Sequence, residues 1–219
     1  MSGFATQFAA AFMVTVSLAL VSGAIGTTVG LSFAIFKNAS TAGIGRIVSA
    51  YTTVVRGVPE LLIILLIYFG GTAFASKVAG RYVEVNAFTA GAFALSVVFS
   101  GYATEVFRGA IAAIPVGQME AAKSLGLNAW HRWLFVAGPQ MLRLALPAYG
   151  NLWMSLFKDT SLVSIVGLTD IMRVAYVGAG SLRAPLTFYL AASALYLFLT
   201  SLTLLSMRLA ERRYPAFSS

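Results

Sequence analysis

Long apolar stretches dominate the chain, and polar residues gather in the segments between them. An α-helix rises about 1.5 Å per residue, so about 20 apolar residues are needed to cross the hydrocarbon of a bilayer. Five stretches approach this requirement, and we predict one membrane-spanning helix in each. These spans cover approximately residues 12–36, 51–74, 86–108, 138–160 and 185–208.

The first stretch is uncharged from residue 1 to residue 36. A signal peptide has a basic start and an apolar core of only about 7–15 residues, so we expect this segment to be retained as the first span. Gly26 and Gly30 within it have the small-xxx-small spacing that lets two helices approach closely.

Prolines interrupt two of the predicted spans. In the second, Pro59 lies between Arg56 and Glu60. Proline removes a backbone donor and clashes with the preceding turn, so we expect a helix break here that exposes backbone groups. In the fourth, Pro139 and Pro147 leave the start of the helix poorly defined.

Composition supports a membrane protein. Of the 219 residues, 59% are hydrophobic and 10% are charged, and the mean hydropathy is +0.85. Soluble domains carry about 25% charged residues, so lipid must be the solvent for much of this surface. We predict an all-α integral membrane protein, with residues 1–219 forming a single domain.

The net charge of +8 arises from 15 Lys and Arg residues against 7 Asp and Glu residues. The basic residues flank apolar stretches instead of forming one soluble face, which excludes a nucleic-acid partner. With the N-terminus outside, ten of them lie on the inner side and five on the outer side. This asymmetry predicts an N-out, C-in orientation. The absence of cysteine and the single histidine, His131, exclude disulfides and Cys/His metal sites.

The inner segment 109–134 is longer than a tight connection requires. Pro115 ends the preceding helix, a short helix can begin at Gln118, and Gly126 supplies the left-handed residue that commonly ends a helix. At the spacing i, i+3, i+4, i+7, one face of this helix carries Gln118, Ala121, Ala122 and Leu125. Such a small-residue face admits close approach by another protein, although an ordinary amphipathic connector is the alternative.

This segment resembles the cytoplasmic EAA motif of the permease subunits of ATP-binding-cassette (ABC) importers. The resemblance is carried by Gly117-Gln-Met-Glu-Ala-Ala122, by Gly126, and by the two prolines further on. In that family the helix sits in a groove of an ATPase subunit and transmits the closure of that subunit to the membrane helices. The resemblance therefore implies an ATPase-coupling role for Gly117, Gln118, Glu120, Ala121, Ala122 and Gly126.

Further motifs are similar to the polar amino-acid branch of these permeases. They are Arg56-Gly-Val-Pro-Glu-Leu61, Tyr102-Ala-Thr-Glu-Val-Phe-Arg-Gly109 and Lys158-Asp-Thr-Ser-Leu162. Within that branch, Tyr51–Pro59, Leu162–Asp170 and Glu211–Tyr214 most resemble the Q-type subunit of importers for histidine, for lysine, arginine and ornithine, or for opines.

The resemblance implies the type I importer fold with five spans in the bacterial inner membrane. It also implies a second permease subunit of a distinct M-type, two ATPase subunits and a periplasmic binding protein. The chain has no Gly-x-x-x-x-Gly-Lys-Ser/Thr loop, so ATP and Mg²⁺ are expected to bind to the partner ATPase, and this chain is not expected to be an enzyme.

Charged residues at membrane depth are the candidates for the substrate pathway, because each costs about 2.5–3.5 kcal/mol to insert. Asp159 can meet a cationic group, Thr160 and Ser161 offer hydroxyls, and Lys158 can meet a carboxylate. A helix-end cap in which Asp159 satisfies Lys158 is the alternative.

Three other pairs of opposite charge are close in sequence. Arg56 and Glu60 belong either to the substrate pathway or to an ion pair at the inner boundary. Glu105 and Arg108, three positions apart, have the same two interpretations. Asp170 and Arg173 are expected to form a structural pair in the outer segment 161–185, which we expect to contain a short helix at the outer rim.

Two other functions are weighed against the importer. An ion-coupled secondary transporter of amino acids would need no ATPase, and the inner loop of EAA type argues against it. An intramembrane enzyme would need a nucleophile with its base, or a set of metal ligands. The sequence offers neither, so no catalytic residue and no metal site are predicted.

Overall fold

The structure, a computed structural model, describes residues 2–39 and 42–213, and helices account for most of them. In chain order the elements are α1 (Ser2–Ala39), α2 (Ala42–Gly57), α3 (Glu60–Ala79), α4 (Ala87–Ala112), α5 (Val116–Ser124), α6 (Ala129–Arg132), the π-helical turn η1 (Trp133–Ala137), α7 (Gly138–Asp159), the 3₁₀ segment η2 (Thr160–Val166), α8 (Ile171–Leu182) and α9 (Pro185–Arg213).

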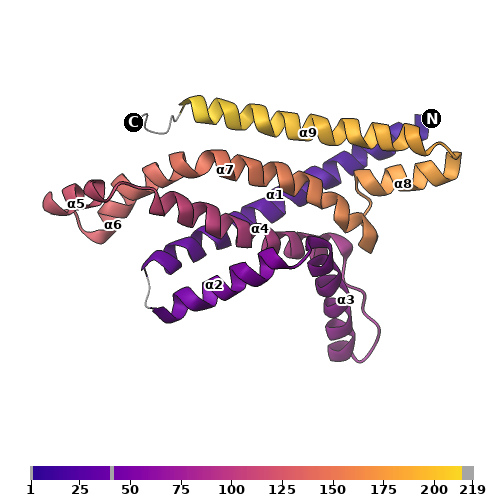
Figure 1. The fold of residues 1–219 in the computed structure, drawn as a ribbon. Helices are drawn as coiled ribbons and strands as arrows, with labels where there is room; N and C mark the ends of the chain where they lie inside the picture. The colour runs from indigo at the N-terminus through magenta and orange to yellow at the C-terminus, as the bar shows by residue number, and fades with distance from the viewer. Residues whose placement is uncertain (1, 40–41, 214–219) are drawn as a thin grey trace.

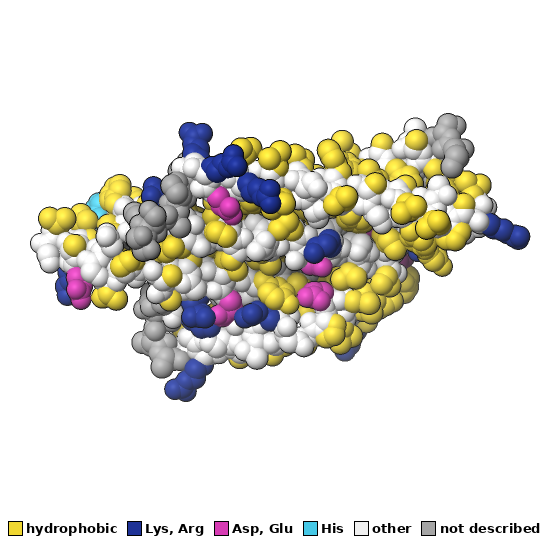
Figure 2. Space-filling model, turned by 45° about the horizontal axis from the view of Figure 1, so that its top comes forward, with side chains coloured by type: hydrophobic (Ala, Val, Ile, Leu, Met, Phe, Trp, Pro, Cys, Tyr) yellow, Lys and Arg dark blue, Asp and Glu magenta, His cyan; other side chains and the backbone are white. Residues whose placement is uncertain are grey.

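The long helices α1, α4, α7 and α9 form an elongated bundle (Figure 1). The short helices α5 and α6 lie at one end of this bundle, and α8 lies near the other end with the N-terminus. Helix α3 projects away from the bundle. Basic side chains gather toward the end of the bundle at which α9 ends, whereas apolar side chains cover much of the rest of the face seen in Figure 2.

Within the described residues, four helices are long and apolar enough to cross a membrane. They cover residues 3–37, 60–79, 87–112 and 185–213. A fifth span results if the segments 129–166 and 171–182, which meet at a bend of 53°, are counted as one.

The helix break expected at Pro59 is present. Pro59 adopts an extended conformation with φ −54° and ψ 133°, and it separates α2 from α3. The stretch 51–74 therefore contains parts of two helices, and the apolar helix runs from Glu60 to Ala79.

Helix α4 is the centre of the fold. Two thirds of its most apolar window (67%) is buried inside the protein, compared with 17% for α3 and for α9.

Helix α1 packs along α4 at the predicted glycine pair. A Cβ atom on Gly30 would lie 2.7 Å from Cβ of Ala103, and one on Gly26 would lie 2.9 Å from Cβ of Phe99. The close approach predicted from this spacing is confirmed.

The short helix expected in the outer segment is α8, but it is more deeply packed than a helix at the rim would be. Ile171 and Ala175 are fully buried, and α8 contacts both α1 and α9. Gly167, with φ 93°, ends η2 and turns the chain toward α8.

The α1–α4 contact predicts the effect of an added methyl group. In Gly30→Ala the new Cβ would overlap Ala103 and approach the Ser100 carbonyl, so the folded state should lose about 1–3 kcal/mol. Gly109→Ala, on the open side of α4, is the matched control and should have no such cost. Thermal unfolding of the purified protein measures both, and equal melting temperatures for the two variants would contradict the packing described.

Candidate substrate cavity and coupling helix

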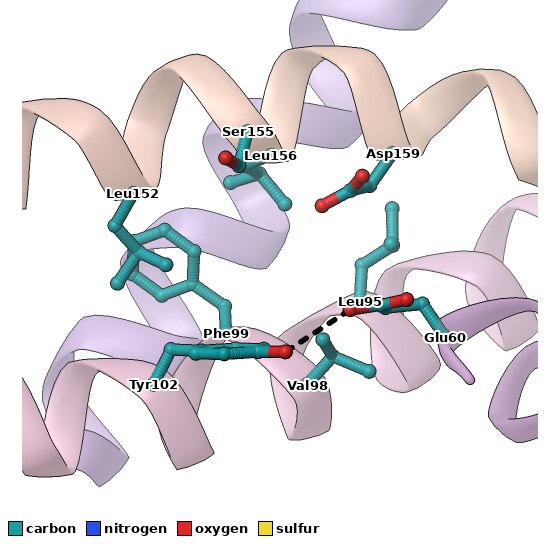
Figure 3. Close-up of a pocket in the computed structure, with 9 residues that line it drawn as sticks. All are labelled: Glu60, Leu95, Val98, Phe99, Tyr102, Leu152, Ser155, Leu156 and Asp159. Atoms are coloured by element: carbon teal, nitrogen blue, oxygen red, sulfur yellow. Dashed lines mark hydrogen bonds between the residues drawn. The ribbon is translucent and has the colours of Figure 1, made fainter. Parts of the chain in front are cut away.

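A cavity of about 240 Å³ lies between the start of α3, the middle of α4 and the end of α7. Two carboxylates from different helices, Glu60 and Asp159, face it (Figure 3). Its remaining lining residues are Leu95, Val98, Phe99, Tyr102, Leu152, Ser155 and Leu156.

The local fold explains how these side chains meet. The break at Pro59 makes Glu60 the first residue of α3, where a carboxylate is favoured by the helix dipole. Asp159 is the last residue of α7, before the chain tightens into η2. Tyr102 on α4 lines the same cavity as these two carboxylates. Its hydroxyl donates a hydrogen bond to Oε1 of Glu60 at 3.2 Å.

Neither carboxylate forms an ion pair within 4 Å of a basic side chain among the described residues. Every ion pair between described residues involves Glu105, and Asp159 has no hydrogen-bond partner among these residues. The pairing of Arg56 with Glu60 allowed by the sequence does not form, because the break at Pro59 removes the helical i, i+4 geometry. Instead, the guanidinium of Arg56 lies 5.5 Å from the centroid of the Tyr102 ring.

Only Asp159 of the predicted stretch 158–161 reaches this cavity. Lys158 and Ser161 line a separate groove with Tyr196 of α9. Thr160 is fully buried, and its hydroxyl donates to the Phe157 carbonyl at 2.7 Å. Within the part of the chain that is described, Lys158 and Asp159 do not form the helix-end pair given as the alternative.

Glu105 forms the predicted pair with Arg108, whose Nε lies 2.7 Å from Oε2. Two further partners come from other helices. Lys37 Nζ of α1 lies 2.9 Å from Oε1, and the Thr52 hydroxyl of α2 donates to the same oxygen at 3.2 Å. The cluster therefore joins α1, α2 and α4, which short-range spacing in the sequence could not reveal.

Asp170 is fully buried and caps α8. It accepts a hydrogen bond from the backbone N–H of Arg173 at 2.8 Å and one from the Tyr196 hydroxyl at 3.4 Å. Asp170 thus contacts Arg173 through the backbone N–H of Arg173 and not through its side chain. The Arg173 guanidinium lies instead over the ring of Tyr176, 5.9 Å from the ring centroid.

The short helix predicted within residues 109–134 is α5, which begins two residues before the predicted Gln118. Gly126 adopts the expected left-handed conformation, with φ 75°. Its N–H donates to the Lys123 carbonyl, and the Leu127 N–H donates to the Ala122 carbonyl, which is the double hydrogen bond of a Schellman motif.

The face predicted for α5 contains one buried side chain, and its other side chains are exposed to solvent. Ala122 is buried against the rest of the chain, whereas Gln118, Glu120 and Ala121 are exposed. Leu125 is 80% exposed, so an apolar side chain remains uncovered at the end of the helix. Ala122 therefore fastens α5 to the protein, and the other residues are free to meet a partner.

Known proteins resemble this chain along nearly all of its length. Residues 26–215 match the family of binding-protein-dependent transport system inner membrane components. The chain belongs to this family. The permease is 44% identical over 208 residues to the nopaline transport system permease protein NocQ of Agrobacterium fabrum, an alignment that covers 92% of this chain and 88% of NocQ. It is 35% identical to the arginine ABC transporter permease protein ArtQ of Haemophilus influenzae, over 99% of this chain and 97% of ArtQ.

Solved structures agree with this assignment. A crystal structure of an amino acid ABC transporter with histidines matches the permease with a TM-score of 0.85 and 32% identity, over 97% of this chain and 96% of that chain. The MetNI methionine ABC transporter matches with a TM-score of 0.82 at 18% identity, which shows the fold alone. The protein is thus an all-helical, multi-pass inner-membrane permease of the ABC importer class.

The Glu105 cluster yields a prediction for stability. Glu105→Gln leaves Lys37 and Arg108 without their shared carboxylate, so we expect a loss of about 1–3 kcal/mol, as for other charged hydrogen bonds. Lys77→Gln, which removes an exposed charge near the end of α3, should leave the melting temperature unchanged. Equal melting temperatures for the two variants would show that the cluster does not hold the helices together.

Proposed function

We propose that this permease moves basic amino acids or opines across the inner membrane, and that their cationic groups pass between Glu60 and Asp159. The observation that supports this most strongly is a cavity between α3, α4 and α7 that is lined by two carboxylates, neither of which forms an ion pair among the described residues. Charges in such a place call for a partner or an aqueous path, and a guanidinium, ammonium or imidazolium group provides that partner.

The named relatives point to the same chemistry. They include permeases for nopaline, arginine and, in the HisQ protein of Salmonella typhimurium, histidine, lysine, arginine and ornithine. The HisQ protein is 33% identical to this chain, over 97% of this chain and 95% of HisQ.

The complete importer would contain this permease, a second M-type permease subunit, two ATPase subunits that bind ATP and Mg²⁺, and a periplasmic binding protein. Five spans with the N-terminus outside would place α5 on the cytoplasmic side. The gathering of basic side chains toward the end of the bundle at which α9 ends supports this orientation (Figure 2).

In the mechanism we propose, α5 is the contact with the ATPase. Exposed Gln118, Glu120 and Ala121 would meet the groove of the ATPase, Gly117 and Gly126 would shape the ends of the helix, and buried Ala122 would transmit its movement. Closure of the ATPase would move α5, and rocking of the spans would open the cavity outward and then inward.

The ion-coupled secondary transporter is the competing function. It would predict uptake by this chain in liposomes without any ATPase. Membership of a binding-protein-dependent transport family favours the ATP-driven importer.

Removal of the charges in the cavity tests the substrate pathway. Glu60→Gln and Asp159→Asn should each lower arginine uptake by about tenfold or more, because one charged interaction contributes about 1.5–3 kcal/mol. Uptake is measured in proteoliposomes that contain the whole importer. Glu84→Gln, on the connection between α3 and α4, is the control and should transport normally. Normal uptake by both cavity variants would rule out this pathway.

The shape of the coupling helix yields a separate prediction. Gly126→Val places a β-branched residue at φ 75°, a strain of about 1–2 kcal/mol that should alter the end of α5. We expect ATP hydrolysis to continue while the arginine moved per ATP falls. Ser124→Ala, on the same helix, should keep the ratio of transport to hydrolysis, and an unchanged ratio in Gly126→Val would contradict the role of α5.

A further inference from the structure

An amino acid carries a carboxylate as well as its cationic groups, and the cavity has no place for the carboxylate. Its polar lining consists of Glu60, Asp159 and the hydroxyls of Tyr102 and Ser155. A substrate carboxylate among these groups would meet like charge, so its partner must lie beside the cavity.

Each carboxylate has a basic residue close to it in sequence: Arg56 is four residues before Glu60, and Lys158 directly precedes Asp159. Lys158 does not line the cavity, because it lies in the separate groove with Tyr196 of α9. Arg56 instead contacts a residue that lines the cavity, because its guanidinium lies 5.5 Å from the Tyr102 ring centroid. Tyr102 therefore contacts a cation through its ring and a carboxylate through its hydroxyl.

The packing of α2 on α4 holds this arrangement. Gly101, next to Tyr102, lies so close to α2 that an added Cβ atom would be 2.8 Å from Cγ1 of Val55 and 3.9 Å from Cγ of Arg56. The aliphatic part of Arg56 is thereby kept against α4, while its side chain stays exposed and free to bind an anion.

We propose that Arg56 is a specificity-determining residue that binds the carboxylate of the substrate, and that Tyr102 is the positioning residue that orients Arg56 and Glu60 at opposite ends of the substrate. This inference rests on the proposed function of the cavity. Recognition at both ends selects an intact amino acid over an amine that has the same side chain and no carboxylate.

Arginine and its decarboxylated analogue agmatine are suitable probes, because both carry a guanidinium and only arginine carries a carboxylate. Their binding is measured by titration calorimetry on the purified complex of permease and ATPase subunits, without the binding protein. The unaltered complex should prefer arginine. Arg56→Gln should weaken arginine binding by about tenfold, the effect of one charge-assisted hydrogen bond, and leave agmatine binding unchanged.

Two tyrosine variants separate the ring from the hydroxyl. Tyr102→Phe retains the ring, so it should weaken both ligands alike and keep the preference for arginine. Tyr102→Leu removes the support of Arg56 and should abolish the preference. The melting temperature of each variant complex confirms that it is folded.

Lys158→Gln is the matched control, since it removes the other nearby cation and should keep the preference for arginine. Equal weakening of arginine and agmatine by Arg56→Gln, or loss of the preference in Lys158→Gln, would overturn the role of Arg56 and leave the cavity intact as the pathway. Failure of the unaltered complex to bind either ligand would instead overturn the cavity itself, and this inference with it.

Discussion

The contact of α1 with α4 is the interaction on which the rest of the structure depends. Glycines at positions 26 and 30 let the two backbones approach until an added methyl group would overlap α4. Helix α4 is thereby buried along most of its length, and the helices α2, α3 and α7 pack on its remaining sides. Residues from these helices meet at Tyr102 and at Glu105, so one close helix pair positions both charged sites.

The Glu105 cluster and the cavity between Glu60 and Asp159 use carboxylates in opposite ways. Glu105 has two cations and a hydroxyl around it, and its charge is satisfied within the chain. Among the described residues, Glu60 accepts a hydrogen bond from the Tyr102 hydroxyl alone, and Asp159 forms neither a hydrogen bond nor an ion pair. In a lipid environment a satisfied carboxylate stabilises the fold, whereas an unsatisfied pair with a cavity between its members is suited to bind a passing cation.

Several features could be predicted from sequence because they depend on local spacing. Four helices of membrane-spanning length followed from apolar length, the break before Glu60 from Pro59, the end of α5 from Gly126, and the Glu105–Arg108 pair from a separation of three residues. The resemblance to amino-acid importer permeases, which rested on motifs along the whole chain, is confirmed by the family and its relatives.

Features that depend on tertiary packing were not accessible in this way. Lys158 and Asp159 are adjacent in sequence, yet the end of α7 directs them into different cavities. Lys37 approaches Glu105 from a helix 68 residues away. In the sequence Tyr102 is only one member of a motif, whereas in the fold its ring contacts Arg56 and its hydroxyl contacts Glu60. Ala122 matched the periodicity of the exposed face of α5, but packing against the chain buries it.

The most direct test of the central claim is a cryo-EM structure of the complete importer, with an ATPase that cannot hydrolyse ATP and with saturating arginine. The account predicts density for the guanidinium between Glu60 and Asp159, bordered by Tyr102. Arginine bound elsewhere along the translocation path, with these two carboxylates paired to side chains of the second permease subunit, would contradict it.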